Sequence, residues 1–434
     1  MTKVQATKID CPSCGAPITL RTFTNASRVR CEYCDTLIDQ KHTGLSIVEQ
    51  YDKAQTFKPK IPLGSRGRFE GKTFEVVGFL RREAPEFSWY EYLLFNPYHG
   101  YRFLSESNRH WSYVRTLKSE PSKGGGFHPA LHHDGRTFKK FASYPAAVSY
   151  VFGEFYWQVK VGDRAYVTDY VCPPDLISAE RAKDGSAAEI QYSIATYMTP
   201  EDVFGRFKLE PPRGTPLGVM ANEPNPHAGA WRDIKRLAIA FLAAFVVLTM
   251  LYAARTDGGV ALRQTLPVKL EPAPPSATPE AGSEAAPTVF TTDSFQLRGG
   301  SRNVELTFSC GGLNRNWIAY TGNLINTTTE QAWPFEVEFE YWSGPGWSEG
   351  SRSASVVLGA IPDGDYKLVL MPYTGLPTVQ ARRARGQVTV RRNVMLWRYV
   401  VLIFLLLLVV PAFVGFRYAV FESSRWADSD FGGG

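Results

Sequence analysis

Two long apolar runs constrain the fold of this chain more than any other feature. Residues 237–254 (LAIAFLAAFVVLTMLYAA) and 399–416 (YVVLIFLLLLVVPAFVGF) each hold 18 residues without a charge, and arginines flank both runs. A bilayer core of about 30 Å needs roughly 20 helical residues, and flanking arginines extend a run by reaching to the interface. The alternative, a buried core helix, rarely continues this far without a polar face. The sequence therefore predicts transmembrane helices over 236–255 and 397–417.

The composition excludes several other classes of protein. The chain has 434 residues, of which 44% are hydrophobic and 13% aromatic, so we expect about three domains with β-rich cores. Four of the six cysteines lie within the first 34 residues, which does not fit a secreted disulfide framework. A net charge of +6 over this length is too dilute to indicate binding to a polyanion.

Two signals disagree about orientation in the membrane. Five basic residues lie near the outer ends of the spans and nine near the ends of the connecting segment, which by a simple positive-inside count places that segment in the cytosol. The rule is calibrated on short loops, however, and this segment is long. The N-terminal MTKVQATKID lacks the apolar core of a signal peptide, and clustered thiols suit a reducing compartment. We therefore expect a multi-pass inner-membrane protein with cytoplasmic N- and C-termini and residues 256–397 extracytoplasmic.

The fold class expected is a mostly β, multi-domain membrane protein. An N-terminal zinc ribbon and a β-rich, barrel-like cytosolic domain precede two transmembrane helices that flank an extracytoplasmic β-sandwich. The expected segments are a zinc ribbon (1–45), a β-rich domain (58–210), a linker (211–235), a first span (236–255), a Pro/Ala-rich tether (256–290), a β-sandwich (291–392), a second span (397–417) and a cytosolic tail (418–434).

The strongest chemical signal is a pair of C-x2-C motifs. Cys11 and Cys14 lie in CPSCG, and Cys31 and Cys34 lie in CEYCD, sixteen residues further on. Each motif directs two sulfurs to one point, so the four predict a tetrahedral thiolate site, which with no open position would hold a structural Zn²⁺. The alternative is two unrelated cysteine pairs.

The ribbon also contains three arginines, and zinc ribbons often bind nucleic acid or protein. Arg21, Arg28 and Arg30 have no interleaved aromatic residues, so we interpret them as a solvated face and do not expect nucleic acid as a partner.

The 58–210 region contains an internal repeat. EGKTFEVVGF is echoed by DGRTFKKFAS, and HGYRFLSES by VGDRAYVTD, which predicts two related β-meanders that form halves of a small barrel. Asp175 in PPDLISAE and Thr199 in TPEDVFGRF have the chemistry of helix N-caps, with Pro200 in the first turn of the second helix.

A catalytic constellation is not recognisable in this region. His132, His133 and Asp134 could bind a metal, but neighbouring strand residues point to opposite faces, and a solvated loop is the simpler interpretation. Glu154 in GEFYW could be an acid with a raised pKa, although a satisfied carboxylate at a strand end is commoner. Cys172 in VCPP is interpreted as a buried structural thiol.

The 291–392 region has the pattern of a β-sandwich. Apolar residues alternate with glutamates in FEVEFEY, and Tyr366 follows a turn in IPDGDYKLVL, as in the tyrosine corners of sandwiches. Trp333, Trp342 and Trp347 could line a ligand groove, or serve core and edge packing. Cys310 has no disulfide partner within this domain.

An arginine-rich strip precedes the second span. We expect it to contact anionic lipid headgroups, with a solubilising strand end as the alternative. The strip consists of Arg382, Arg383, Arg385, Arg391 and Arg392, followed by Arg398.

Several stretches resemble a known bacterial family. LGSRGRFEGKTFEVVGFL, WYEYLLFNPYHGYRFLSE and GEFYWQVKVGDRAYVTDYVCPP, within residues 61–210, are similar to the family catalogued as domain of unknown function 4178. The ribbon start, the two spans and the tail RWADSD are similar to its full-length members. The family has no established activity, and the resemblance implies a role in envelope stress or membrane maintenance beside phage-shock-like membrane-remodelling proteins.

These observations favour one function and leave two open. We expect a non-enzymatic, membrane-anchored scaffold or sensor that contacts the bilayer and recruits protein partners through its cytosolic domains. The alternatives are an enzyme with an unrecognised active site in residues 61–210 and a membrane-tethered zinc-ribbon nucleic-acid binder.

Overall fold

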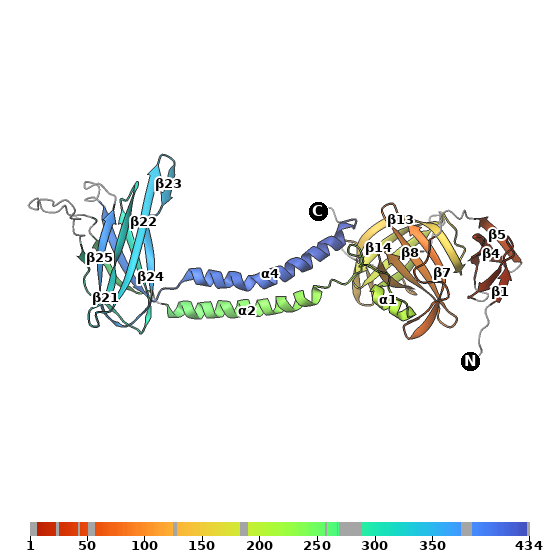
Figure 1. The fold of residues 1–434 in the computed structure, drawn as a ribbon, viewed down its shortest axis with the longest axis horizontal. Helices are drawn as coiled ribbons and strands as arrows, with labels where there is room; N and C mark the ends of the chain where they lie inside the picture. Colours follow the sequence, from red (N-terminus) through yellow and green to blue (C-terminus); the bar gives the residue numbers. More distant parts are fainter. Residues whose placement is uncertain are drawn as a thin grey trace, which may run out of the picture. The chain divides into compact units, whose positions relative to one another are not determined.

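A computed structural model describes most of the chain as two compact units (Figure 1). The described residues are 7–22, 26–41, 44–50, 57–124, 128–182, 190–256, 258–266, 268, 289–374 and 384–431. The first unit consists of residues 1–235 and 410–434, and the second of residues 236–409.

The first unit contains sixteen strands and a short helix among its described residues. They are β1 (Thr7–Asp10), β2 (Pro17–Leu20), β3 (Arg28–Arg30), β4 (Thr36–Lys41), β5 (Gly44–Gln50), β6 (Arg66–Phe69), β7 (Lys72–Glu83), β8 (Ser88–Asn96), β9 (Gly100–Ser107), β10 (His110–Thr116), β11 (Ser122–Gly124), β12 (Ala130–His133), β13 (Arg136–Phe155), β14 (Arg164–Cys172), β15 (Asp175–Ala182), β16 (Gln191–Met198) and α1 (Pro200–Phe207).

Eight of these strands close into an antiparallel barrel. Their order is β7, β8, β9, β10, β16, β15, β14 and β13, and β13 then pairs with β7 to complete the ring (Figure 1). Strand β13 reaches both neighbours because it is 20 residues long and its register shifts between Lys140 and Ala142 and again between Val148 and Tyr150. Such bulges bend a strand and allow a sheet to curve back on itself.

The repeated sequences form equivalent hairpins. Glu70–Gly71 joins β6 to β7 and Asp134–Gly135 joins β12 to β13, and all four residues have positive φ, as in a type I′ turn. Gly100 and Gly162, the next matched pair, also have positive φ; Gly100 is the first residue of β9, and Gly162 lies just before β14.

One predicted helix is a strand and the other is confirmed. The helix expected after Asp175 is β15, because this segment pairs along one edge with β14 and along the other with β16. The Asp175 carboxylate accepts hydrogen bonds from Arg136 and the Thr196 hydroxyl instead of capping a helix. Helix α1 begins as predicted, with Pro200 in its first turn and the Thr199 hydroxyl accepting from the Asp202 N–H.

Helix α1 covers part of the outer barrel surface. Its buried residues Val203, Phe204 and Phe207 pack with outward-facing side chains such as Trp111 and Phe69. The opposite face of β10, which carries His110, Ser112 and Val114, points into the barrel.

The cysteine-bearing module is joined to the barrel by a continuous sheet. β1 pairs with β2, while β3, β4 and β5 form a three-stranded extension in which β3 pairs with the end of β13. The module therefore belongs to the first compact unit.

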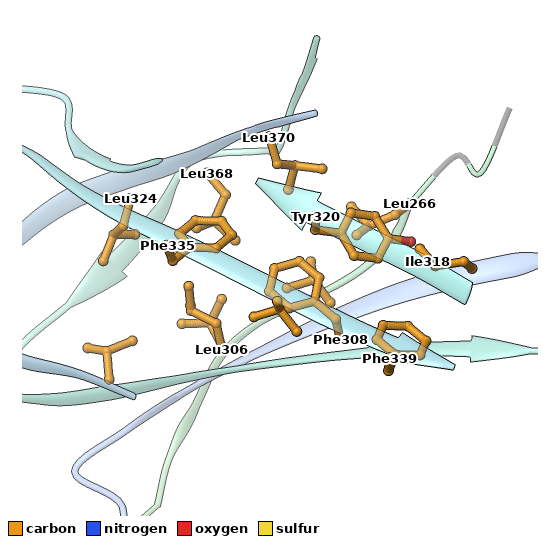
Figure 2. Close-up of a cluster of buried hydrophobic side chains, with 14 of the residues drawn as sticks. Leu266, Leu306, Phe308, Ile318, Tyr320, Leu324, Phe335, Phe339, Leu368 and Leu370 are labelled. Carbon is orange, nitrogen blue, oxygen red and sulfur yellow. The ribbon is translucent and has the colours of Figure 1, made fainter. Parts of the chain in front are cut away.

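The second unit contains two packed sheets. One has the order β17 (Val260–Leu266), β26 (Arg385–Arg392), β20 (Arg302–Gly311) and β24 (Ser353–Ile361). The other contains β18 (Phe290–Thr291), β25 (Gly364–Thr374), β21 (Asn316–Asn326), β22 (Ala332–Gly344) and β23 (Trp347–Gly350), with β19 (Phe295–Leu297) also on β25. Their facing side chains, including Phe308, Tyr320 and Phe335, form one core (Figure 2).

The sandwich has the expected tyrosine corner and begins earlier than expected. The Tyr366 hydroxyl donates to the Pro362 carbonyl at 3.0 Å. β17 lies in the segment predicted as a tether, because VALRQTL pairs with β26 and places Leu266 in the core. Of the remaining tether, residues 269–288 lie outside the described residues. Cys310 is buried and free.

Two long helices carry the apolar runs. α2 (Ala228–Arg255) and α4 (Trp397–Ala427) are long and apolar enough to cross a membrane. Their apolar windows have no buried residues, unlike the core helix of a soluble protein, which is mostly buried. Phe245 and Phe404 lie with ring centroids 6.2 Å apart. α2 begins at Ala228, inside the predicted linker, because no proline follows Pro226 there. α4 continues beyond the predicted span through the first part of the tail.

Candidate metal centre and barrel cavity

The four cysteines of the N-terminal module lie together. Their sulfur atoms are all within 4.8 Å of one another, with Cys11 Sγ 3.7 Å from Cys34 Sγ and Cys14 Sγ 3.8 Å from Cys31 Sγ. A metal that binds four sulfurs at about 2.3 Å places them about 3.8 Å apart. The spacing therefore fits a tetrahedral metal site and is too long for disulfides.

Two similar backbone turns position these sulfurs. The N–H of Gly15 donates to the Cys11 carbonyl at 2.9 Å, and the N–H of Asp35 donates to the Cys31 carbonyl at 3.1 Å. Gly15 and Asp35 both have positive φ, of 73° and 59°. Asp35 thus adopts the left-handed conformation that the second motif requires, although it is not glycine.

Hydrogen bonds favour an ionised sulfur at one of the four positions. Burial opposes ionisation of Cys34, but hydrogen bonding of the ionised sulfur with the Thr36 hydroxyl and N–H lowers the pKa of this thiol to about 6. Burial raises the pKa of Cys31 to about 12. Metal binding requires thiolates, so a bound cation would supply the charge that stabilises the buried sulfur.

Glu154 anchors the cysteine module to the barrel. Its carboxylate accepts from the Arg21 N–H at 2.6 Å, the Thr22 N–H at 2.8 Å and the Thr22 hydroxyl at 2.7 Å. Burial raises the pKa of Glu154, and the three hydrogen bonds counteract that shift. Glu154 is therefore the satisfied carboxylate near a strand end that the sequence suggested.

The module's arginines correct the sequence interpretation. Arg28 and Arg30 are 8% and 3% exposed, so they do not form a solvated face. Arg28 donates to the Val159 carbonyl at 2.8 Å and Arg30 to the Val151 carbonyl at 2.5 Å. Both side chains are used in binding the barrel, and only Arg21 of the three remains half-exposed.

The barrel encloses a cavity of about 780 Å³. This volume is within the range of small-molecule sites, and an eight-stranded barrel is wide enough to hold one small ligand. Inward-facing residues of β14 illustrate the lining: Ala165, Val167 and Asp169 alternate with residues that face outward. The cavity reaches solvent where its exposed lining residues lie, which include Glu86, Phe87, Arg164 and Gln191.

A polar cluster lies among the apolar walls of the cavity. Arg82 donates to both carboxylate oxygens of Glu180, at 2.9 and 2.7 Å, and lies 3.5 Å from Glu91. Asp169, 8% exposed, accepts from the Tyr144 hydroxyl at 2.7 Å and from the Ser178 hydroxyl. Burial raises the pKa of Asp169.

A segment at residues 217–223 covers another part of the cavity. The amide of Asn222 donates to the Ser112 hydroxyl and the Ala195 carbonyl, both at 3.1 Å. His110 Nε2 lies 3.2 Å from the Leu217 carbonyl. We call residues 217–223 the cover segment.

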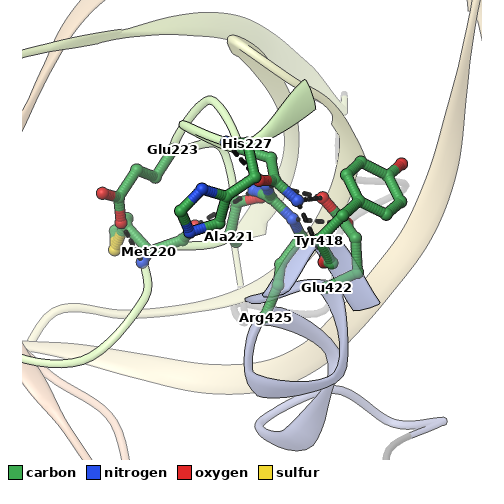
Figure 3. Close-up of polar contacts among 8 residues, drawn as sticks. Met220, Ala221, Glu223, His227, Tyr418, Glu422 and Arg425 are labelled. Carbon is green, nitrogen blue, oxygen red and sulfur yellow. Dashed lines mark hydrogen bonds and ion pairs between the residues drawn. The ribbon is translucent and has the colours of Figure 1, made fainter. Parts of the chain in front are cut away.

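The tail of α4 is bound to the cover segment (Figure 3). Arg425 is 1% exposed and donates to the carbonyls of Met220 and Ala221 at 3.3 and 2.7 Å, while Glu422 accepts from its Nε at 3.0 Å. Further along, Asp430 pairs with Lys140 at 2.8 Å, and Asp428 lines the cavity.

Sequence reasoning missed the cavity and the role of the tail. The inward residues Arg82, Glu91 and Asp169 lie on three different strands, and none belongs to a recognisable motif. The tail motif RWADSD, which contains Arg425, was noticed only as part of the family resemblance, and no role was predicted for it.

The other polar candidates do not assemble into a site. His132 and His133 lie on β12 and not in a loop; His132 is exposed and lies 3.0 Å from the Thr137 hydroxyl, while His133 lies 3.4 Å from Asp134. Cys172 is half-buried and lies 3.3 Å from Arg136 Nη2.

The three tryptophans of the sandwich differ in their surroundings. Trp333 packs against Tyr366 with ring centroids 5.9 Å apart, whereas Trp342 and Trp347 are exposed.

The arginine strip is divided by the alternation of β26. Arg385 and Arg391 are exposed on one face, whereas Arg392 is buried on the other and donates to Asp363 at 2.7 Å. Arg392 is therefore not free to contact lipid. Arg398 is exposed, and Arg382 and Arg383 lie outside the described residues.

Comparison with known families identifies the barrel domain. Residues 62–200 match the family described as Domain of unknown function (DUF4178), which confirms the resemblance seen in the sequence. The match begins just before β6 and ends at the start of α1, so it includes every strand of the closed barrel. The cysteine module, the long helices and the sandwich lie outside the matched residues. No curated protein matches this chain.

Proposed function

We propose that this protein is a non-enzymatic, membrane-anchored sensor or scaffold that acts in envelope stress or membrane maintenance. The observation that carries the proposal is the contact of Arg425, at the end of α4, with the segment that covers the barrel cavity. A helix that crosses the membrane would thereby be linked directly to a domain with a ligand-sized interior.

The same contact supports an orientation. α2 leaves the barrel domain and α4 returns to it, because Asn225 before α2 donates to Glu422 of α4 at 2.8 Å. If both helices cross the bilayer, the barrel and the tail lie on one side and residues 256–397 on the other. We place the barrel side in the cytoplasm of a bacterial cell, because the four thiols suit a reducing compartment.

The metal would serve structure and not catalysis. A site with four cysteine ligands has no open position for substrate, and Zn²⁺ prefers this tetrahedral sulfur set. Zinc would hold the module in the conformation in which β3 pairs with β13, and the module would offer a surface to protein partners such as phage-shock-like membrane-remodelling proteins.

The nucleic-acid alternative loses support in the first unit. Two of the three module arginines, Arg28 and Arg30, are buried against barrel carbonyls and are not available to phosphates. The enzyme alternative retains one observation in its favour, the buried Asp169 within the cavity.

Paired reporter fusions test the orientation. A reporter that is active only outside the cytosol should be active when inserted near Gly282 and inactive when fused after Gly434. A cytosolic reporter should give the opposite pattern at the same two positions. Activity of the outside reporter at Gly434 and not at Gly282 would contradict the proposal.

A further inference from the structure

The lining of the barrel cavity has a surplus of acidic groups. Two arginines line it, Arg82 and Arg164. Six carboxylates line it, and they come from both the strands and the tail: Glu86, Glu91, Asp163, Asp169, Glu180 and Asp428. An acidic, partly dehydrated interior attracts cations and repels anions more strongly than an open surface does.

The buried cation does not neutralise this surplus. Arg82 is shared between Glu91 and Glu180, so the three side chains together carry one excess negative charge when ionised. Asp169 adds another, because among the described residues no Lys, Arg or His nitrogen lies within 4.0 Å of its carboxylate. Its described hydrogen-bond partners are the neutral hydroxyls of Tyr144 and Ser178.

Asp169 also has acceptor capacity left for a ligand. A carboxylate offers about four acceptor positions, and two hydroxyl donors occupy only part of them. A buried carboxylate without a charged partner is costly, so a cation bound beside it would recover the lost free energy.

The walls around these acids are apolar and aromatic. Trp89, Tyr144 and Trp157 are among the rings that line the cavity, and Val114 and Val167 are among its aliphatic residues. Aromatic faces attract organic cations, and Arg82 already lies 5.4 Å from the Trp89 ring centroid. An inorganic cation would leave most of a cavity of about 780 Å³ unfilled.

We propose that the barrel cavity is a binding site for a small organic cation, an ammonium group on an apolar body, with the ammonium beside Asp169. This inference rests on the sensor function proposed above, since it names the class of ligand that the sensor would bind. An anionic ligand such as a fatty acid of similar size would meet the carboxylates unfavourably.

Three probes that differ only in charge test the ligand class. Hexylammonium, hexan-1-ol and hexanoate are titrated calorimetrically into the full-length protein in zwitterionic lipid nanodiscs, with empty nanodiscs as the blank. We expect hexylammonium to bind at least about tenfold more tightly than hexanoate, with hexan-1-ol between them. Hexanoate that binds as tightly as hexylammonium, or no binding of hexylammonium, would overturn the inference.

Two variants then locate the ammonium group. Asp169→Asn removes the charge with little change in shape and should weaken hexylammonium about tenfold while leaving hexan-1-ol unchanged. Ser178→Ala removes one hydroxyl but keeps the carboxylate, and should retain hexylammonium binding. Equal hexylammonium affinity in Asp169→Asn and the natural protein would contradict the placement. If Asp169→Asn does not fold, the relative affinities of the natural protein for hexylammonium, hexan-1-ol and hexanoate alone test the ligand class.

Failure of this inference is distinguishable from failure of the proposed function. Hydrogen exchange of residues 217–223 reports whether the tail is bound, independently of any ligand. A cavity that rejects hexylammonium while these amides stay protected would exclude the ligand class and leave the sensor proposal intact.

Discussion

Arg425 Nη1 donates a 2.7 Å hydrogen bond to the carbonyl oxygen of Ala221, a residue 204 positions earlier in the chain. The Arg425 side chain is 1% exposed, so its buried charge is stabilised by the carbonyls of Met220 and Ala221 and by the Glu422 carboxylate instead of by water. Ala221 and Asn222 line the cavity, so the residue that Arg425 binds is itself part of the cavity wall. A displacement of α4 would therefore change the cover of the cavity.

The metal site gives the first prediction. The purified, reduced protein should contain one zinc per chain, and Cys31→Ser should lose it and expose residues 1–45 to protease, because four-thiolate sites couple metal binding to folding. Elemental analysis and limited proteolysis measure both effects. Cys172→Ser is the matched control and should retain the metal, whereas a zinc-free natural protein would exclude the site.

Glu154 should hold the module to the barrel more strongly than an exposed ion pair does. Glu154→Ala leaves three donors without a partner, at a cost of about 1–3 kcal/mol, so the amides of Arg21 and Thr22 should exchange roughly tenfold or more faster. Glu75→Gln, which removes the partly exposed ion pairs of Glu75 with Arg21 and Arg66, should cost at most about 1 kcal/mol for each pair. Equal effects of the two variants on hydrogen exchange would show that Glu154 has no special role.

Much of the local structure was predictable because its causes lie close together in the sequence. The C-x2-C turns, the Thr199 cap of α1 and the Tyr366 corner each depend on residues within about five positions of one another. The helix predicted after Asp175 was wrong for the opposite reason. The pairing of this segment with β14 and β16, which lie elsewhere in the chain, outweighs the local capping signal.

The buried roles of charged residues were not predictable from local patterns. Arg30 binds the carbonyl of Val151, 121 residues away, and Arg392 binds Asp363, 29 residues away. Without these distant partners an arginine is expected to be solvated, which is why Arg28, Arg30 and Arg392 were assigned to exposed surfaces. The cavity is missed for the same reason, since its lining comes from separate strands.

Stability should depend on pH through Asp169. Burial raises the pKa of this carboxyl above its ordinary value of 3.8, so the folded protein retains a proton that the unfolded chain has released. Between these two pKa values the free energy of unfolding therefore falls as pH rises. Asp169→Asn should remove this decline, so its stability relative to the natural protein should increase with pH across that window and then level off. Urea titrations at a series of pH values measure the difference, and a difference that decreases with pH would contradict the assignment.

The arginine strip predicts a weak, salt-sensitive contact with anionic lipid. Arg385→Gln and Arg391→Gln should each reduce binding of the sandwich to anionic vesicles by about 1 kcal/mol at low salt, because both side chains are exposed. Arg392→Gln should instead destabilise the sandwich, since it removes the partner of Asp363. Vesicle flotation across a salt series separates these effects, and binding that ignores both salt and lipid charge would exclude the contact.

The most direct test of the link between α4 and the barrel is hydrogen exchange of the cover segment. In the full-length protein in nanodiscs, Arg425→Ala should accelerate exchange of the Leu217 and Glu223 amides about tenfold or more, because the buried side chain that binds the Met220 and Ala221 carbonyls is lost. Arg213→Ala, which removes an exposed arginine from the same irregular segment, should leave both amides unchanged. Protection at Leu217 and Glu223 that is the same in Arg425→Ala as in the natural protein would contradict the account.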